Sequence, residues 1–292
     1  MKLFKFISSI FESDFYLNGF RLFVSRSLCL HCSLLLHGNQ LEIKSKILRN
    51  KFIELTLRSN SLYIRMEVDF KGIKAVVFDF DGTLYNNRHF PFWFVMADLS
   101  EIFIMKKERT FRKDMQGVDL KTKEAFEKEF YGRLATAKKC SFESAKVWYE
   151  NDFMNRFISV LEKHYFANDK VEEVFGKLNQ KGIATAVYSD YPMLPQRMKA
   201  VGLPENLTRN CWCAPTMGAF KPACRPMYEI AQSLSVSCSE ILMVGDREDT
   251  DGESAFSCGA KFVRIRKNDK DYGKLDYPFM TWDEFANKVL SL

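Results

Sequence analysis

The chain has 292 residues, of which 47% are hydrophobic and 27% charged, and this composition is typical of a globular protein with an ample core. A formal net charge of +6 could indicate a nucleic-acid or membrane partner, but the basic excess lies within residues 1–65, which hold 10 Lys and Arg against 4 Asp and Glu. The remaining residues hold 33 of each sign, so no nucleic-acid partner is expected for the body of the chain.

Residues 1–65 form a basic N-terminal extension that contains no Ala and no Pro. An apolar run over residues 22–36 is interrupted by Arg26 and His31 and is shorter than the roughly 20 residues of a spanning helix, so we expect no transmembrane segment. No small-residue cleavage site follows it, which disfavours a secretory signal. Three hypotheses remain for this extension: a membrane-surface arm, a poorly ordered segment, or a misassigned start with Met66 as the true initiator.

The first predicted core strand covers Ile73 to Phe78, an almost uniformly apolar run that indicates a buried parallel strand. Two carboxylates, Asp79 and Asp81, follow it directly and precede Gly82. Ligands of open α/β sheets bind at the carboxyl ends of strands, and two acids this close are stabilised by a cation or a shared proton. The alternative is a solvated Asp-Gly turn at a strand end.

Residues 86–170 show helical periodicity and no convincing strand, with apolar residues at Phe153, Phe157, Val160 and Leu161. A parallel strand pair needs a crossover of about a dozen residues, whereas about 100 separate the first strand from the next. We therefore expect an inserted helical domain over these residues. Its mixed charges, as in Lys106-Lys107-Glu108-Arg109 and Arg112-Lys113, favour an exposed helix face over a contact with an anionic substrate.

The α/β pattern resumes with a helix whose apolar positions are Val171, Val174, Phe175 and Leu178. A second strand is predicted over residues 183–188 and a third within residues 207–214. The expected fold class is therefore α/β, with a Rossmann-like parallel sheet formed by residues 66–85 and 171–292 and with the α-helical domain inserted between them.

Three further polar sites adjoin predicted elements of this core. Ser189 ends the second strand, and Lys221 precedes a proline where a helix begins. A buried strand over residues 241–244 is followed by Gly245-Asp246, and Asp249 and Asp251 come shortly after. Five acids between residues 246 and 253 need a cation or abundant water.

Together these four sites resemble the motifs of the haloacid dehalogenase-like hydrolases, a superfamily made up largely of phosphatases. Asp79-Phe80-Asp81-Gly82-Thr83 is similar to the first motif, and Ser189, Lys221 and Gly245-Asp246 match the others in order. The resemblance implies that the helical insertion is a cap that closes over the active site. It also implies hydrolysis of a phosphomonoester of a small metabolite through an aspartyl-phosphate intermediate.

The resemblance assigns a role to each matched residue. Asp79 would attack phosphorus, and Asp81 would protonate the leaving oxygen and then activate water. Ser189 and Lys221 would bind the phosphoryl group, since a hydroxyl donates to an anion and an ammonium neutralises it. These roles are chemically consistent, because a carboxylate is a weak nucleophile towards a dianion unless charge is neutralised nearby.

The implied cofactor is Mg²⁺, which prefers oxygen ligands. Its expected ligands are Asp79, the backbone carbonyl of Asp81, Asp246 and Asp251. We prefer Asp251 to Asp249 because Asp251 stands eight residues before Gly259, the usual distance in the family. Asp249 remains the alternative ligand.

Asp81 disfavours one branch of the superfamily, the haloalkanoate dehalogenases, which lack an acid there because no alkoxide needs a proton. A sugar phosphomutase remains an alternative, as does a catalytically silent binding protein that uses the basic N-terminal arm. Asn86, where many relatives carry Asp, leaves the substrate subgroup open, and the motifs do not indicate an oligomeric state. The eight cysteines lack the spacing of a disulfide scaffold, so we expect free thiols and a cytoplasmic location.

Overall fold

The structure is a computed structural model in which residues 68–266 and 277–292 are described. The described residues all belong to one unit of the chain, residues 66–292. The predicted N-terminal extension and the proposed start at Met66 lie outside the described residues.

The core is a six-stranded parallel sheet with strand order β3-β2-β1-β4-β5-β6. This confirms the predicted α/β fold with a Rossmann-like sheet. Each predicted strand is present, although the third is shorter than its predicted window. The strands are β1 (Ala75–Phe78), β2 (Ala184–Ser189), β3 (Cys211–Cys213), β4 (Ile241–Gly245), β5 (Lys261–Ile265) and β6 (Phe279–Met280).

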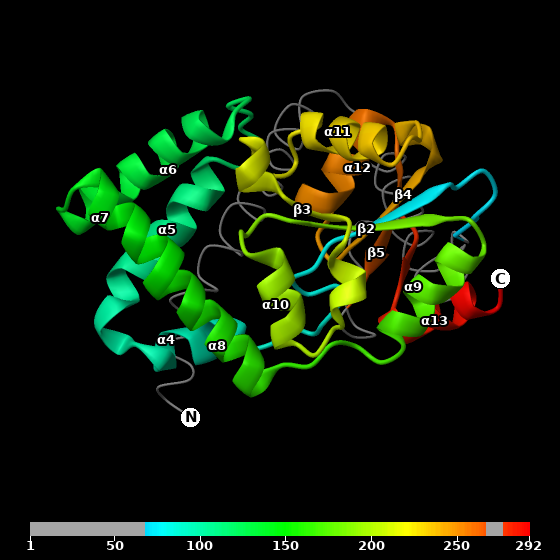
Figure 1. The fold of residues 1–292 in the computed structure, drawn as a ribbon, viewed down its shortest axis with the longest axis horizontal. Helices are drawn as coiled ribbons and strands as arrows, with labels where there is room; N and C mark the ends of the chain where they lie inside the picture. The colour runs from blue at the N-terminus through cyan, green and yellow to red at the C-terminus, as the bar shows by residue number, and fades with distance from the viewer. Residues whose placement is uncertain (1–67, 267–276) are drawn as a thin grey trace, which may run out of the picture. The chain divides into compact units, whose positions relative to one another are not determined.

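Helices cover both faces of the sheet (Figure 1). One face carries α11 (Arg225–Ser233) and α12 (Glu253–Cys258), and the other carries α9 (Val171–Gln180) and α13 (Trp282–Leu290). The central strand β1 is therefore buried along its whole length, which explains why its sequence lacks polar alternation.

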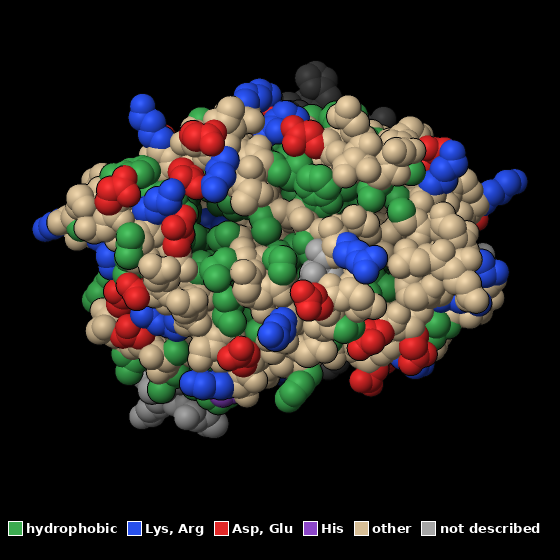
Figure 2. Space-filling model, viewed as in Figure 1, with side chains coloured by type: hydrophobic (Ala, Val, Ile, Leu, Met, Phe, Trp, Pro, Cys, Tyr) green, Lys and Arg blue, Asp and Glu red, His purple; other side chains and the backbone are tan. Residues whose placement is uncertain are grey.

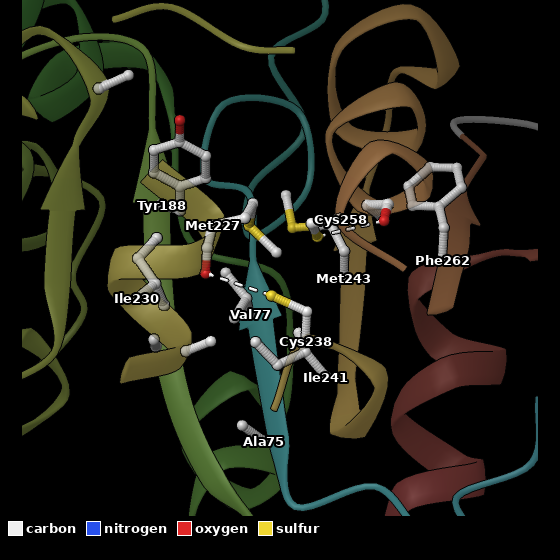
Figure 3. Close-up of a cluster of buried hydrophobic side chains, with 14 of the residues drawn as sticks. Ala75, Val77, Tyr188, Met227, Ile230, Cys238, Ile241, Met243, Cys258 and Phe262 are labelled. Carbon is white, nitrogen blue, oxygen red and sulfur yellow. Dashed lines mark hydrogen bonds between the residues drawn. The ribbon is translucent and has the colours of Figure 1, made fainter. Parts of the chain in front are cut away.

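Alternate residues of β1 face opposite layers. Ala75 and Val77 join a buried cluster that includes Met227 and Ile230 of α11 (Figure 3). Phe78 faces the other layer, where its ring stacks on Phe175 of α9 at a centroid distance of 4.7 Å. Because both faces of β1 are packed, the backbone at its carboxyl end has a fixed position from which Asp79 and Asp81 project.

Helices fill the interval between β1 and β2, and the part of the chain described there contains no strand. They form a separate group on the left of Figure 1. In α8 the apolar residues that predicted a helix lie on its buried face, since its buried residues include Phe157, Val160 and Leu161. The helices are α4 (Phe90–Ala97), α5 (Ile102–Asp114), α6 (Lys123–Lys138), α7 (Phe142–Val147), a π-helical turn η2 (Trp148–Phe153) and α8 (Met154–His164).

The charged run in α5 is not a uniformly exposed face, so that expectation was wrong for two of its residues. Glu108 is buried, and Arg112 is largely covered because its guanidinium lies 3.7 Å from the ring centre of Tyr191 in the core. Arg112 also donates a hydrogen bond to the backbone oxygen of Asp190 at 3.2 Å. α5 therefore contacts the sheet domain through a cation that the charge pattern alone assigns to solvent.

Other elements complete the core and the surface. The short helix α10 (Leu194–Ala200) follows β2, and a π-helical turn η6 (Glu248–Gly252) follows β4. None of the described helices is both long and apolar enough to cross a membrane. Basic and acidic side chains are interspersed over the face seen in Figure 2, in keeping with the balanced charge of residues 66–292.

Candidate active site

A glycine turn brings the first pair of acids next to the end of β4. Gly82 has a φ of +99°, and a Cβ at this position would lie 2.4 Å from Oδ2 of Asp246. Only glycine combines this backbone conformation with so close an approach. The Asp-Gly sequence thus serves to place the loop after β1 against the loop after β4.

Three buried carboxylates gather where β1 and β4 end. Asp79, Asp246 and Asp251 offer oxygen atoms that all lie within 4.8 Å of one another. Gly245 makes room for this cluster, because a Cβ there would lie 2.4 Å from the carboxyl group of Asp251. Burial, followed by the negative charge of Asp251, raises the pKa of Asp79 well above its usual value.

Lys221 provides the positive charge next to these acids. Its Nζ, which is buried, donates to Oδ1 of Asp79 at 2.7 Å and to Oδ1 of Asp251 at 2.8 Å. Burial opposes its charge, but the two carboxylates outweigh that effect, so the pKa of Lys221 is raised well above its usual value. The other oxygen of Asp79, Oδ2, accepts a hydrogen bond from Thr83 at 3.0 Å.

Asp81 lies in a second network beside the first. Its Oδ1 accepts from the hydroxyl of Tyr85 at 2.9 Å, and its Oδ2 accepts from Ser189 at 3.0 Å. Oδ2 also forms an ion pair with the guanidinium of Arg197, whose Nη1 lies 2.7 Å away. The backbone oxygen of Asp81 accepts from Asn87 at 3.1 Å.

A family model described as the haloacid dehalogenase-like hydrolases matches residues 73–259, which is more than half of the chain. The chain belongs to the haloacid dehalogenase-like hydrolase family. The predicted membership is thereby confirmed, and the protein is a hydrolase of this family. No curated protein matches the chain in sequence.

Solved structures share the fold at low sequence identity. A 2-haloacid dehalogenase from Pseudomonas syringae pv. Tomato DC3000 has a TM-score of 0.51 and 17% identity, covering 75% of this chain and 98% of its own. A predicted phosphoglycolate phosphatase from Haemophilus somnus has a TM-score of 0.50 and 17% identity over 74% and 98% of the two chains. A family IA, variant 3 hydrolase from Entamoeba histolytica has a TM-score of 0.50 and 18% identity over 75% and 100%. These likenesses establish the fold and do not distinguish between dehalogenation and phosphoester hydrolysis.

The carboxylate cluster fits the divalent metal that the family generally uses. Mg²⁺ binds oxygen atoms at about 2.0–2.1 Å in an octahedron, so oxygens on one ion lie about 3–4 Å apart. The oxygens of Asp79, Asp246 and Asp251 approach this spacing. A divalent cation would also relieve the mutual repulsion that burial imposes on these acids.

Asp249 does not join the cluster. Its carboxylate accepts from Nε and Nη2 of Arg247 at 3.0 and 2.6 Å, and it is more than half exposed. Gln116, which follows α5, donates to its backbone oxygen at 3.1 Å. The geometry therefore favours Asp251 over Asp249 as the second acidic ligand in the loop after β4.

Ser189 and Lys221 are joined to the site by neighbours that the motifs did not reveal. The hydroxyl of Ser189 accepts from Nη2 of Arg197 at 2.8 Å and from the backbone nitrogen of Tyr191 at 3.2 Å, while donating to Asp81. Asp190 accepts a hydrogen bond from the backbone nitrogen of Lys221 at 2.9 Å. The residues at the end of β2, Ser189 and Asp190, thus position both Asp81 and Lys221.

Arg197 is the main residue of the site that sequence reasoning missed. It is fully buried in α10, where Leu194 and Met198 are buried as well. A signal was available, since an arginine that shares the apolar face of a short helix at this spacing needs a buried acidic partner.

Proposed function

We propose that the protein is a magnesium-dependent phosphomonoester hydrolase that acts on a small phosphorylated metabolite through an aspartyl-phosphate intermediate. The observation that carries this proposal is the placement of Asp81 beside Asp79 in a hydrogen-bond network of its own. A halide leaves without a proton, whereas an alkoxide needs one. An acid held at this position therefore supports phosphoester chemistry over dehalogenation.

In the first step we assign Asp79 as nucleophile and Asp81 as acid. A bond forms between a carboxylate oxygen of Asp79 and phosphorus as the bond between phosphorus and the ester oxygen breaks, and Asp81 gives its proton to that oxygen. The two contacts of Asp79, from Lys221 and Thr83, hold its carboxylate in place for this attack.

In the second step Asp81 acts as a base. It takes a proton from a water molecule as that water attacks phosphorus and the bond to Asp79 breaks, which releases inorganic phosphate. A positioned carboxyl group contributes roughly 10²–10⁴-fold to such proton transfers.

Lys221 and Ser189 are the proposed phosphoryl-binding groups. Lys221 already lies against Asp79, so its charge adjoins the position of the transferred group. Ser189 has a single hydroxyl hydrogen, which points at Asp81, so binding a phosphoryl oxygen requires that hydrogen to turn.

The metal site of this proposal consists of Asp79, Asp246 and Asp251 with the backbone oxygen of Asp81. That oxygen has a second lone pair beyond its bond with Asn87. When bound, Mg²⁺ would offset the negative charge of the phosphate and of the nucleophile.

We assign residues 86–170 as a cap over the site, within a chain whose core is residues 66–85 and 171–292. Contacts between the segment that connects α5 to α6 and the loop that holds Gly218 and Lys221 support this assignment. The backbone nitrogen of Gly117 donates to the backbone oxygen of Lys221 at 3.1 Å, and that of Leu120 donates to Gly218 at 2.8 Å. A cytoplasmic location completes the proposal and agrees with the free cysteines of the described residues.

The test is hydrolysis of p-nitrophenyl phosphate by the full chain with Mg²⁺, with EDTA, and with the D79N variant. The proposal predicts metal-dependent release of phosphate that falls by about 10³-fold or more in D79N. Chloride release from 2-chloropropanoate, measured in parallel, should be absent. Chloride release without phosphatase activity would overturn the proposal, and isomerisation of a hexose 1-phosphate without hydrolysis would replace it with a phosphomutase.

A further inference from the structure

Arg197 connects most of the groups around Asp81, and it does so with nearly all of its donors. Its Nη1 bonds to Oδ2 of Asp81 at 2.7 Å, and its Nη2 bonds to Ser189 at 2.8 Å and to the backbone oxygen of Tyr191 at 2.6 Å. Its Nε donates to the backbone oxygen of Pro192 at 3.0 Å. Four of the five N–H groups of the guanidinium are therefore already used.

Aromatic rings enclose the same guanidinium. The ring centres of Phe80, Phe157 and Tyr191 lie 5.1, 5.6 and 5.7 Å from its central carbon. The side chain is 0% exposed. A group so enclosed and so fully bonded has little capacity to bind a substrate directly, and any effect on the reaction must pass through its partners.

We propose that Arg197 is a positioning residue that fixes the carboxyl group of Asp81 for proton transfer, an inference that rests on the proposed phosphatase function. Arg197 can only donate, so it anchors Oδ2 of Asp81. Oδ1 accepts from the hydroxyl of Tyr85, a group that can donate or accept. Oδ1 is thereby the oxygen that exchanges its proton with the ester oxygen and with water.

Ser189 cannot perform this task alone. Once its hydroxyl hydrogen turns to a phosphoryl oxygen, its bond to Asp81 is lost. The bond from Arg197 to Oδ2 stays, because the bonds to the backbone oxygens of Tyr191 and Pro192 hold the guanidinium independently of the serine. Arg197 therefore keeps Asp81 in place while the serine binds substrate.

The test compares two substrates that differ mainly in their leaving group, p-nitrophenyl phosphate and phenyl phosphate. Nitrophenolate departs without help, whereas phenolate benefits from a proton. The Arg197→Met variant of the full chain should lose more kcat/KM on phenyl phosphate than on p-nitrophenyl phosphate. The ratio of kcat/KM for p-nitrophenyl phosphate to kcat/KM for phenyl phosphate should therefore rise by at least about tenfold. Asp81→Asn sets the limit of this rise, since it removes the acid itself.

A double variant separates positioning from general damage. If Arg197 acts through Asp81, adding R197M to D81N should leave the substrate ratio of D81N unchanged. The matched control is Arg133→Met, which removes a partly exposed arginine paired with Glu129 on α6 and should keep the wild-type ratio. Thermal unfolding of each variant verifies that it is folded.

Equal losses on both substrates in folded R197M would make Arg197 a structural residue and overturn the inference, as would an unchanged activity. If R197M does not fold, Arg197→Gln, which retains an amide donor for the backbone oxygens of Tyr191 and Pro192, carries the same prediction. Failure of both to fold would also assign a purely structural role. Wild-type protein without activity on either substrate would refute the proposed function instead, so the two failures are distinguishable.

Discussion

Glu108 makes a pH dependence of stability predictable from the structure. It lies on α5 with 2% of its surface exposed, and the hydroxyl of Tyr149 donates to its Oε1 at 3.4 Å. Arg112 lies 3.7 Å from the same oxygen, and the charge of Arg109 also acts on it. Burial outweighs these contacts and raises the pKa of Glu108 from 4.5 to about 7.

The sign and the size of the effect follow from this shift. Between the two pKa values, the unfolded chain has lost the proton that the folded chain retains. The contribution of Glu108 to the free energy of unfolding therefore falls as the pH rises from about 4.5 through about 7. The difference between the two pKa values corresponds to about 3 kcal/mol in total, most of which falls between pH 5 and pH 8. Above pH 8 the contribution is constant.

The perturbation is Glu108→Gln, which cannot ionise and keeps an oxygen for Tyr149. Urea unfolding at a series of pH values from 5 to 8 gives the free energy of unfolding of both proteins. The difference between the variant and wild type should increase by about 2–3 kcal/mol in favour of the variant from pH 5 to pH 8. The exposed Glu162 on α8 offers the matched control, because Glu162→Gln should show no such gain. A constant difference between E108Q and wild type across the range would refute the reasoning.

Two further predictions concern the acidic cluster. Asp251→Asn should weaken Mg²⁺ binding, measured by calorimetry, by at least about tenfold, whereas Asp249→Asn should leave it near wild type; the reverse order would make Asp249 the ligand. Gly82→Ala should lower the free energy of unfolding by about 1–3 kcal/mol and reduce turnover, because its φ is positive and its Cβ would meet Asp246. Wild-type stability and turnover in G82A would contradict the close approach seen here.

The strand-end residues were predictable because their signals are local. An apolar run followed by Asp79 and Asp81 predicts both a buried strand and the edge of the sheet where ligands of open α/β folds bind. The order of Ser189, Lys221 and Asp246 along the chain then predicted that they belong to the same candidate site, and the structure brings them close to Asp79 and Asp81. Parallel strands end at one edge, so residues distant in sequence meet there without further information.

Arg197 and Glu108 were not predictable in the same way. Arg197 lies 116 positions from its partner Asp81, and its short helix gives only a weak periodic signal. Glu108 belongs to a run of mixed charge that normally indicates exposure. Burial of a charge depends on tertiary partners, here Tyr149 and Asp81, whose proximity appears only in the folded chain.

Phosphorylation of Asp79 tests the central claim most directly. The Asp81→Asn variant should accept a phosphoryl group from p-nitrophenyl phosphate, whose leaving group needs no proton, but should release it slowly because the base for water is missing. Acid quenching and peptide mass mapping should then find the phosphoryl group on Asp79, and none when D79N is combined with D81N. A phosphoryl group on another residue, or none in an active enzyme, would contradict the account.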